Sequence, residues 1–320
     1  MARRKVSAQP NVEHWPELPL AQWKDTYATL HMWTQIVGKI RLACTPKINH
    51  WWNSTYYITP RGMTTSTMYR DGGAFQIDFD FIDHLLRFET SSGRSADIEL
   101  ASKTTATFYR EVMETLDALG IEVEIWPHPV EIEDPIPFAE DEQHATYIPE
   151  HAHRYWQVLL ASEQVFQEVR AGFVGKSSPV HFFWGSFDLA LTPFSLREAP
   201  PHPGGVPNMA DWVTREAYSH ECSSCGFWPG TEGGLAEPAY YSYAYPEPAG
   251  FKDYPVRPRH AFYSEELGEF VLLYKDLRRC ADPAAVLRQF LESTYEAAAT
   301  CGAWPRDLLE PEDPSRSLRA

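Results

Sequence analysis

The residues best suited to chemistry lie close together in the second half of the sequence. His220 and Glu221 are neighbours, and a histidine beside a carboxylate can act as a general acid or base. Asp188 lies among apolar residues, where a carboxylate must be paired, be protonated or face a cavity. Arg197 is a natural partner for it. We therefore predict that His220, Glu221 and Asp188 are catalytic residues acting on a small polar molecule.

Other residues of the same region are predicted to contact that ligand. The stretch around His220 and Glu221 is rich in serine, glycine and proline, which predicts a loop, and loops carried on a rigid sheet often form sites. The predicted ligand-binding residues are His181, Trp184, Arg197, Tyr218, Ser224 and Trp228. Two alternatives stay open. One is a non-catalytic protein that binds a small ligand in the same pocket, and the other is a structural or partner-binding protein with a structural Asp188–Arg197 ion pair.

Metal and cofactor motifs are weak in this sequence. His220, Cys222 and Cys225 have a spacing compatible with a metal, but a closed zinc site needs four ligands. We expect the two cysteines to be buried thiols that pack as small apolar side chains. Residues 172–177 end like a phosphate-binding loop, yet they join a predicted helix to a strand, the reverse of the required order. No metal is predicted, and no cofactor is indicated.

Composition and charge exclude some classes of partner. The chain has 320 residues, 43% of them hydrophobic, and a formal net charge of -16 at pH 7. Nucleic acids and anionic membranes are bound by lysine and arginine, so neither is expected as a partner. No segment reaches the roughly 18 apolar residues of a membrane helix, and no apolar segment follows Arg3 and Arg4 as in a secretory signal. Five scattered cysteines fit a reduced, cytoplasmic protein; the oligomeric state is not indicated.

Periodic apolar residues predict the elements of the first half. Apolar residues that step by threes and fours predict a helix over residues 20–40. A second helix is predicted to begin at residues 104–105 and to end at Gly120. Alternation predicts strands at residues 55–59, 75–81, 96–100 and 123–125. Asp78 and Asp80 alternate with phenylalanines, so both are predicted to face solvent.

The second half repeats this order of elements. A helix is predicted over residues 150–171, and a last helix begins at Asp282 and Pro283, a cap followed by a proline at the first helical position. Strands are predicted at residues 180–184, 187–191, 240–245 and 270–274. Val37-Gly38-Lys39 and Val174-Gly175-Lys176 end the first helix of each half. We therefore predict an α+β fold of two similar halves, each with helices packed on a mostly antiparallel sheet, and we hypothesise an internal duplication.

A linker is predicted between the halves. No lysine or arginine occurs from Glu111 through His153, and several prolines that interrupt regular structure fall in this stretch. The predicted division is a flexible tail at 1–14, one half at 15–130, an acidic linker at 131–150, the other half at 151–304 and a flexible tail at 305–320. The predicted site lies at or near the junction of the halves.

Long motifs spread along the chain resemble a known family. They include residues 30–35 (LHMWTQ), 49–52 (NHWW), 79–84 (FDFIDH), 175–190 (GKSSPVHFFWGSFDLA), 215–221 (REAYSHE) and 226–230 (GFWPG). The chain resembles, over nearly its whole length, a domain-of-unknown-function family of mostly bacterial proteins. The resemblance implies no activity, cofactor or catalytic residue.

Overall fold

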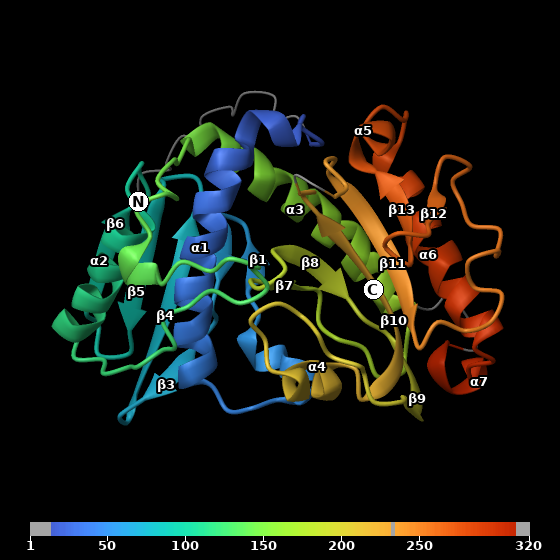
Figure 1. Ribbon diagram of the computed structural model, residues 1–320, viewed down its shortest axis with the longest axis horizontal. Helices are drawn as coiled ribbons and strands as arrows, with labels where there is room; N and C mark the ends of the chain where they lie inside the picture. Colours follow the sequence, from blue (N-terminus) through green and yellow to red (C-terminus); the bar gives the residue numbers. More distant parts are fainter. Residues whose placement is uncertain (1–13, 232–233, 312–320) are drawn as a thin grey trace, which may run out of the picture.

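The first half of the chain forms a long helix, an antiparallel sheet and a second helix in the computed structural model, which describes residues 14–231 and 234–311 (Figure 1). The elements are α1 (Leu20–Cys44), the 3-10 helix η1 (Asn49–Ser54), β1 (Tyr57–Thr59), β2 (Gly62–Thr64), β3 (Met68–Arg70), β4 (Gly73–Asp80), β5 (Leu85–Thr90), β6 (Ser95–Glu99) and α2 (Thr105–Ala118). The strand order is β1-β2-β4-β5-β6, and β3 pairs with β4. Thr104 caps α2 by accepting from the N–H of Thr107 at 3.1 Å.

The second half places helices on one face of a larger antiparallel sheet. Its elements are η2 (Phe138–Glu140), α3 (Pro149–Ala171), β7 (His181–Phe183), β8 (Asp188–Leu191), β9 (Phe194–Glu198), α4 (Asp211–Ala217), β10 (His220–Trp228), β11 (Ala239–Tyr245), β12 (Phe262–Ser264), β13 (Glu269–Leu273), α5 (Tyr274–Leu277), α6 (Pro283–Cys301) and α7 (Arg306–Leu309). The strand order is β12-β13-β11-β10-β8-β7, and β9 pairs with β10. Helix α3 is fixed to this sheet where the Ser162 hydroxyl lies 2.7 Å from that of Tyr240.

The two sheets meet edge to edge. Tyr56, just before β1, exchanges two backbone hydrogen bonds with Phe182 of β7, at 2.9 and 2.8 Å. Helix α1 crosses the first sheet, and its residues are buried nearly all round because the sheet, α2 and α3 surround it (Figure 1). Trp33 of α1 stacks on Phe108 of α2 with ring centroids 4.4 Å apart. Because α1 is buried on nearly every side, its polar residues also lie inside the molecule.

These elements confirm the predicted α+β class and the four long helices. Both halves begin with a long helix, continue into an antiparallel sheet and end in a helix, an order compatible with two similar halves. The strand predicted at residues 123–125 is wrong. Val123 and Ile125 pack on the core from an extended segment that joins neither sheet, so their alternation reflects burial rather than strand pairing.

The segment between the halves packs against them. Residues 131–150, predicted as a linker, contain buried Phe138, Asp141 and Tyr147. Residues 305–311 of the predicted C-terminal tail include α7, whose Leu309 is buried; residues 1–13 and 312–320 lie outside the described part of the chain. No helix within residues 14–231 and 234–311 is both long and apolar enough to span a membrane.

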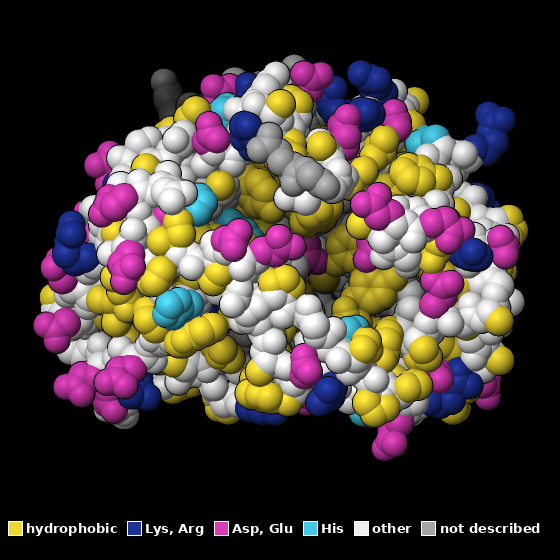
Figure 2. Space-filling view, viewed as in Figure 1, with side chains coloured by type: hydrophobic (Ala, Val, Ile, Leu, Met, Phe, Trp, Pro, Cys, Tyr) yellow, Lys and Arg dark blue, Asp and Glu magenta, His cyan; other side chains and the backbone are white. Residues whose placement is uncertain are grey.

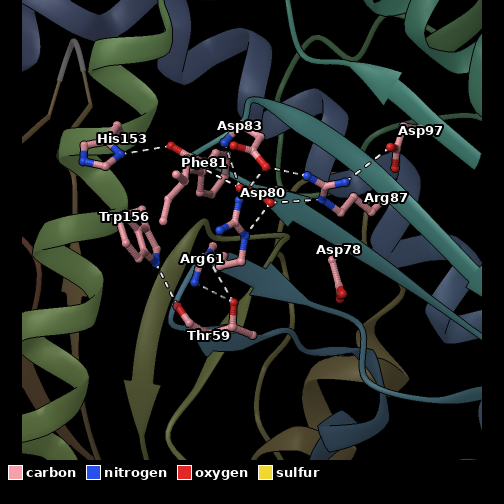
Figure 3. A network of polar contacts seen from close by, with 12 residues as sticks. Thr59, Arg61, Asp78, Asp80, Phe81, Asp83, Arg87, Asp97, His153 and Trp156 are labelled. Carbon is pink, nitrogen blue, oxygen red and sulfur yellow. Dashed lines mark hydrogen bonds and ion pairs between the residues drawn. The ribbon is translucent and has the colours of Figure 1, made fainter. Parts of the chain in front are cut away.

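The prediction that Asp80 faces solvent is wrong, because this carboxylate is 2% exposed within a network of partners (Figure 3). Its Oδ2 accepts from Nε of Arg61 at 2.7 Å and from Nε of Arg87 at 3.0 Å. Its Oδ1 accepts from the N–H groups of Ile82 and Asp83 at 2.9 and 3.0 Å. Although burial opposes the charge, these donors lower the pKa of Asp80 to about 2. The network ties the turn between β1 and β2, the end of β4 and strand β5 together at one end of the first sheet.

Candidate functional site

A cavity of about 850 Å3 lies over one face of the second sheet. Helices α1, η1 and α4 and the segment at residues 124–131 line it on one side, and strands β8, β10, β11 and β13 line it on the other. In Figure 2 a hollow bordered by hydrophobic side chains opens near the middle of the molecule. Small-molecule sites usually have volumes of about 300–1,000 Å3, so this cavity has the size of a ligand site.

Tryptophan side chains form much of the cavity wall. The lining tryptophans are Trp51, Trp52, Trp126, Trp184, Trp212 and Trp228. Trp51 of η1 is held against α4, since its Nε1 donates to the carbonyl of Val213 at 3.0 Å and its ring meets that of Trp212 at 5.3 Å between centroids. Flat rings held in place present π-faces, which favour planar apolar groups and cations as ligands.

Strand geometry brings Asp188 into this cavity. Asp188 begins β8, and its carboxylate accepts hydrogen bonds from the hydroxyls of Ser186 and Tyr241. Tyr241 reaches it across Gly226 of β10, where an added Cβ would lie 2.3 Å from the Tyr241 hydroxyl oxygen. Burial raises the pKa of Asp188 although both hydroxyls stabilise its charged form. The residue therefore carries two neutral donors and no basic partner within the described part of the chain.

Two further carboxyl groups line the same cavity. Burial, followed by the charge of Asp188, raises the pKa of Glu131 and that of Glu269 to about 7 each. Glu269 begins β13, and Glu131 belongs to the segment between the halves, where its φ is 60° and its N–H donates to Pro207 at 2.9 Å. Neither side chain has a hydrogen bond or an ion pair among the described residues. Three carboxyl groups therefore share a cavity, and none of them forms an ion pair among the described residues, although Lys39 lines the same cavity.

Five of the nine predicted site residues line the cavity: Trp184, Asp188, Tyr218, Ser224 and Trp228. The Tyr218 hydroxyl lies 2.7 Å from that of Tyr243, and Ser224 lies 2.9 Å from the hydroxyl of Thr192. Burial raises the pKa of Tyr218 above its ordinary value, so this hydroxyl stays protonated and neutral.

The other four predicted residues lie outside the cavity lining. Arg197 Nε donates to Glu221 at 2.8 Å, and Arg197 Nη2 donates to the carbonyl of Gly302 at the end of α6 at 2.6 Å. Glu221 also accepts from the Ser195 hydroxyl at 2.7 Å. Arg197 therefore pairs with Glu221 and not with Asp188, and this ion pair joins β9, β10 and the end of α6.

The two predicted histidines are also placed apart from Asp188. His181 is fully buried, its Nδ1 lies 3.1 Å from the Thr55 hydroxyl, and burial lowers its pKa to about 3. His220 lies beside His50, with 5.6 Å between ring centroids, and its Nδ1 lies 3.1 Å from the Ser219 hydroxyl. The structure thus does not bring His181, Arg197, His220 and Glu221 around one cavity with Asp188.

The stretch around His220 is a strand and not the predicted loop. Its serines, cysteines and glycine have weak strand propensity, but β10 pairs with β8, β9 and β11 in the middle of the sheet. Backbone pairing and burial on both faces outweigh that propensity. Cys222 and Cys225 are buried thiols, and the described residues hold no group of three or more histidine, cysteine or acidic side chains that could bind a metal ion.

Sequence reasoning missed the acidic partners of Asp188. Glu131 stands in a stretch rich in acidic residues and proline, which predicts a solvated linker. Glu269 precedes an apolar strand, a position where a solvent-exposed carboxylate is common. Lys39, which also lines the cavity, follows Gly38 at what looks like the end of a helix. No local pattern distinguishes these residues, because the fold alone brings them together.

Comparisons with known proteins add a family but no activity. The model of a family of unknown function (DUF5996) matches residues 15–311. No curated protein and no solved structure matches the chain.

Proposed function

We propose that this chain, which belongs to that family of unknown function, binds a small organic molecule in the cavity over the second sheet. The ligand has a planar apolar body that packs on the tryptophans. It also carries a cationic or hydrogen-bond-donating group that meets Asp188, Glu131 and Glu269. The observation that carries this proposal is the set of three carboxyl groups in a tryptophan-lined cavity, none of which forms an ion pair among the described residues.

Buried carboxyl groups without partners cost stability, so their position suggests a role outside folding. Desolvation penalises a carboxylate heavily unless a counter-charge or donors replace the lost water. A ligand ammonium or hydroxyl would supply that replacement and would be held further by cation–π contact with nearby rings. An anionic ligand would add repulsion to three acidic groups, so phosphates and carboxylates are disfavoured.

The predicted acid–base pair of His220 and Glu221 is not part of this proposal. Glu221 already accepts hydrogen bonds from Arg197 and Ser195, so it has little remaining capacity to accept one from a substrate. The proposal retains Asp188, Trp184, Tyr218, Ser224 and Trp228 from the predicted set. It favours the ligand-binding alternative over a structural protein, because a structural protein does not need an open cavity of this size.

Matched probes that differ in charge test the proposal. We expect 2-phenylethylamine to quench tryptophan fluorescence and raise the melting temperature, while 3-phenylpropionate, of similar shape, binds at least about tenfold more weakly. Asp188→Asn should weaken amine binding by a similar factor, because it removes the central charge. Glu221→Gln, outside the cavity, is the control and should bind as the unchanged protein does. Equal binding of amine and carboxylate, or full binding by Asp188→Asn, would falsify the proposal.

A further inference from the structure

Lys39 is a buried lysine whose ammonium group faces the cavity. The residue is 6% exposed and lines the cavity, and it has no hydrogen bond or ion pair among the described residues. Its Nζ lies 4.9 Å from the ring centroid of Trp126 and 5.4 Å from that of Trp184. Burial lowers the pKa of Lys39 to about 8, since no carboxylate offsets the lost hydration.

A purely structural role explains this position poorly. A structural lysine normally buries its aliphatic stem and keeps its ammonium in water or against a carboxylate. Lys39 instead holds its nitrogen between two tryptophan rings inside a cavity. The rings favour the ammonium form, and burial favours the neutral amine, which is the nucleophilic form.

Two connections link the segments that carry Lys39 and Glu131, and both residues line the same cavity. Gln35, one turn before Lys39 on α1, binds the backbone of Val130 on both sides, donating to its carbonyl at 2.9 Å and accepting from its N–H at 2.8 Å. This fixes the residue just before Glu131. The second connection is the pair Trp184 and Gly185: the Trp184 ring lies under the Lys39 nitrogen, and Gly185 packs on the Glu131 carboxyl.

Gly185 is needed for this arrangement. An added Cβ at Gly185 would lie 2.0 Å from Oε1 of Glu131, so a larger residue would push the carboxyl away. His31, two turns before Lys39 on α1, donates from Nε2 to the Gly185 carbonyl at 2.8 Å. His31, Gln35 and Lys39 thus form one polar stripe of α1, and two of its members hold the segments that position Glu131. His31 and Gln35 lie within the motif at residues 30–35, and Lys39 follows it by one helical turn.

From this geometry we propose that Lys39 forms an imine with an aldehyde or ketone in the cavity and that Glu131 is the acid that assists it. The proposal rests on the proposed ligand cavity and names the class of its ligand. The carbonyl compound has a planar apolar body, and its hydroxyl or amino substituent meets Asp188 and Glu269.

The reaction balances without any further reagent. The neutral amine of Lys39 attacks the carbonyl carbon, a C–N bond forms, and the nitrogen proton moves to the carbonyl oxygen to give a carbinolamine. Protonated Glu131 then donates its proton to that hydroxyl, the C–O bond breaks, and water leaves. The iminium product returns a proton to the Glu131 carboxylate as it becomes the neutral imine. A carboxyl group with a pKa of about 7 suits both directions of this transfer.

Reductive trapping of a simple aldehyde tests the proposal. The protein is incubated at neutral pH with 4-hydroxybenzaldehyde and cyanoborohydride, and the modified lysines are located by peptide mass spectrometry. We expect Lys39 to be modified at least about tenfold faster than Lys252, an exposed lysine paired with Glu265. The unreactive 4-hydroxybenzyl alcohol should protect Lys39 and leave Lys252 unaffected. At saturating aldehyde, Glu131→Gln should slow labelling of Lys39 at least about tenfold, so that the loss reflects proton transfer and not weaker binding.

The outcomes separate this inference from the proposed function. If the alcohol and the aldehyde quench tryptophan fluorescence but Lys39 reacts no faster than Lys252, the imine proposal is overturned and the ligand cavity stands. If neither compound binds and Lys39 is not labelled, both proposals fail for this ligand class. Lys39→Arg keeps the positive charge but removes the reactive amine. If this variant loses the fast-labelled peptide and still binds the alcohol, the reaction belongs to Lys39 and the loss does not come from a change in folding.

Discussion

Two acidic clusters of this protein differ in their partners and therefore in their charge. Asp80 accepts from two arginines and two backbone N–H groups, and its pKa falls to about 2. Glu131 and Glu269 lack such donors, and burial raises the pKa of each to about 7. Burial thus opposes the charge of the carboxyl group in both clusters, and the donors around Asp80 outweigh it while Glu131 and Glu269 have none within the described part of the chain. The paired cluster stabilises the fold, and the unpaired cluster is available to a ligand.

The largest difference between the two clusters is expected in stability, when Asp80 of one cluster and Asp188 of the other are each replaced by asparagine. We expect Asp80→Asn to lower the free energy of unfolding by about 3 kcal/mol, because the buried carboxylate accepts from two arginines and two backbone N–H groups, and an amide cannot replace all of these bonds. Asp188→Asn should change it by less than about 1 kcal/mol, since the Ser186 and Tyr241 hydroxyls can reorient toward an amide. Urea unfolding of both variants measures the difference. Equal losses would mean that Asp188 is a structural residue like Asp80.

The second largest effect is expected in the pH dependence of stability. The pKa values of Glu131 and Glu269 rise from 4.5 to about 7, so the folded state binds more protons than the unfolded state between these values. The stability that these two groups contribute therefore falls as pH rises through this window, by at most about 1.4 kcal/mol per pH unit for each group and by less because both are partly exposed. The lowered pKa values of His31 and His181 act in the opposite direction, because these buried histidines stabilise the fold increasingly as pH rises towards 6.5. Urea unfolding between about pH 5 and pH 7 measures this slope.

Variants assign that slope to one cluster. Replacing Glu131 and Glu269 together by glutamine should make stability rise more, or fall less, with pH in this window, because neither amide titrates while the buried His31 and His181 still do. Asp80→Asn should leave the slope unchanged, because Asp80 titrates below this window. Its lowered pKa has the opposite effect on stability: the stabilisation by Asp80 is complete above about pH 3.8 and is lost as pH falls through about 2. A slope that the double substitution leaves unchanged would contradict the assignment.

The smallest effect is expected at the ion pair of Arg197 and Glu221. Both groups are partly exposed, and such pairs contribute about 0–1 kcal/mol. We therefore expect Glu221→Gln to lower the free energy of unfolding by less than about 1 kcal/mol and to leave ligand binding unchanged. Thermal melting and probe titration measure the two properties. A large loss of probe binding would return Glu221 to the site.

The sequence predicts the long helices well because each has a local pattern. The helical periodicity of α1, the Thr104 cap of α2 and the Asp282 cap of α6 are local patterns, and the structure confirms the helix and both caps, although α1 is buried on more than the one predicted face. Strand β10 was not predicted, because its extended conformation depends on pairing with β8 and β11, which are distant in the sequence. The same limit applies to Asp80, whose burial depends on Arg61 and Arg87 from other strands.

The cavity could be predicted only in part. Asp188 was recognisable because a carboxylate among apolar residues is locally unusual. Glu131 and Glu269 were not, since their burial follows from the way the segment at residues 124–131 covers the second sheet. His220 and Glu221 attracted attention as neighbours in sequence, but alternate residues of a strand point to opposite faces, so adjacency did not place both at one site.

The backbone pairing of Tyr56 with Phe182 has a consequence for the solubility of fragments. Unpaired strand edges recruit strands from other chains, and here β1 and β7 shield each other at the place where the sheets meet. A chain cut within residues 131–150 into two pieces would uncover both edges at once. Each piece made alone should therefore aggregate, whereas the two pieces made together should reassemble along this junction and stay in solution.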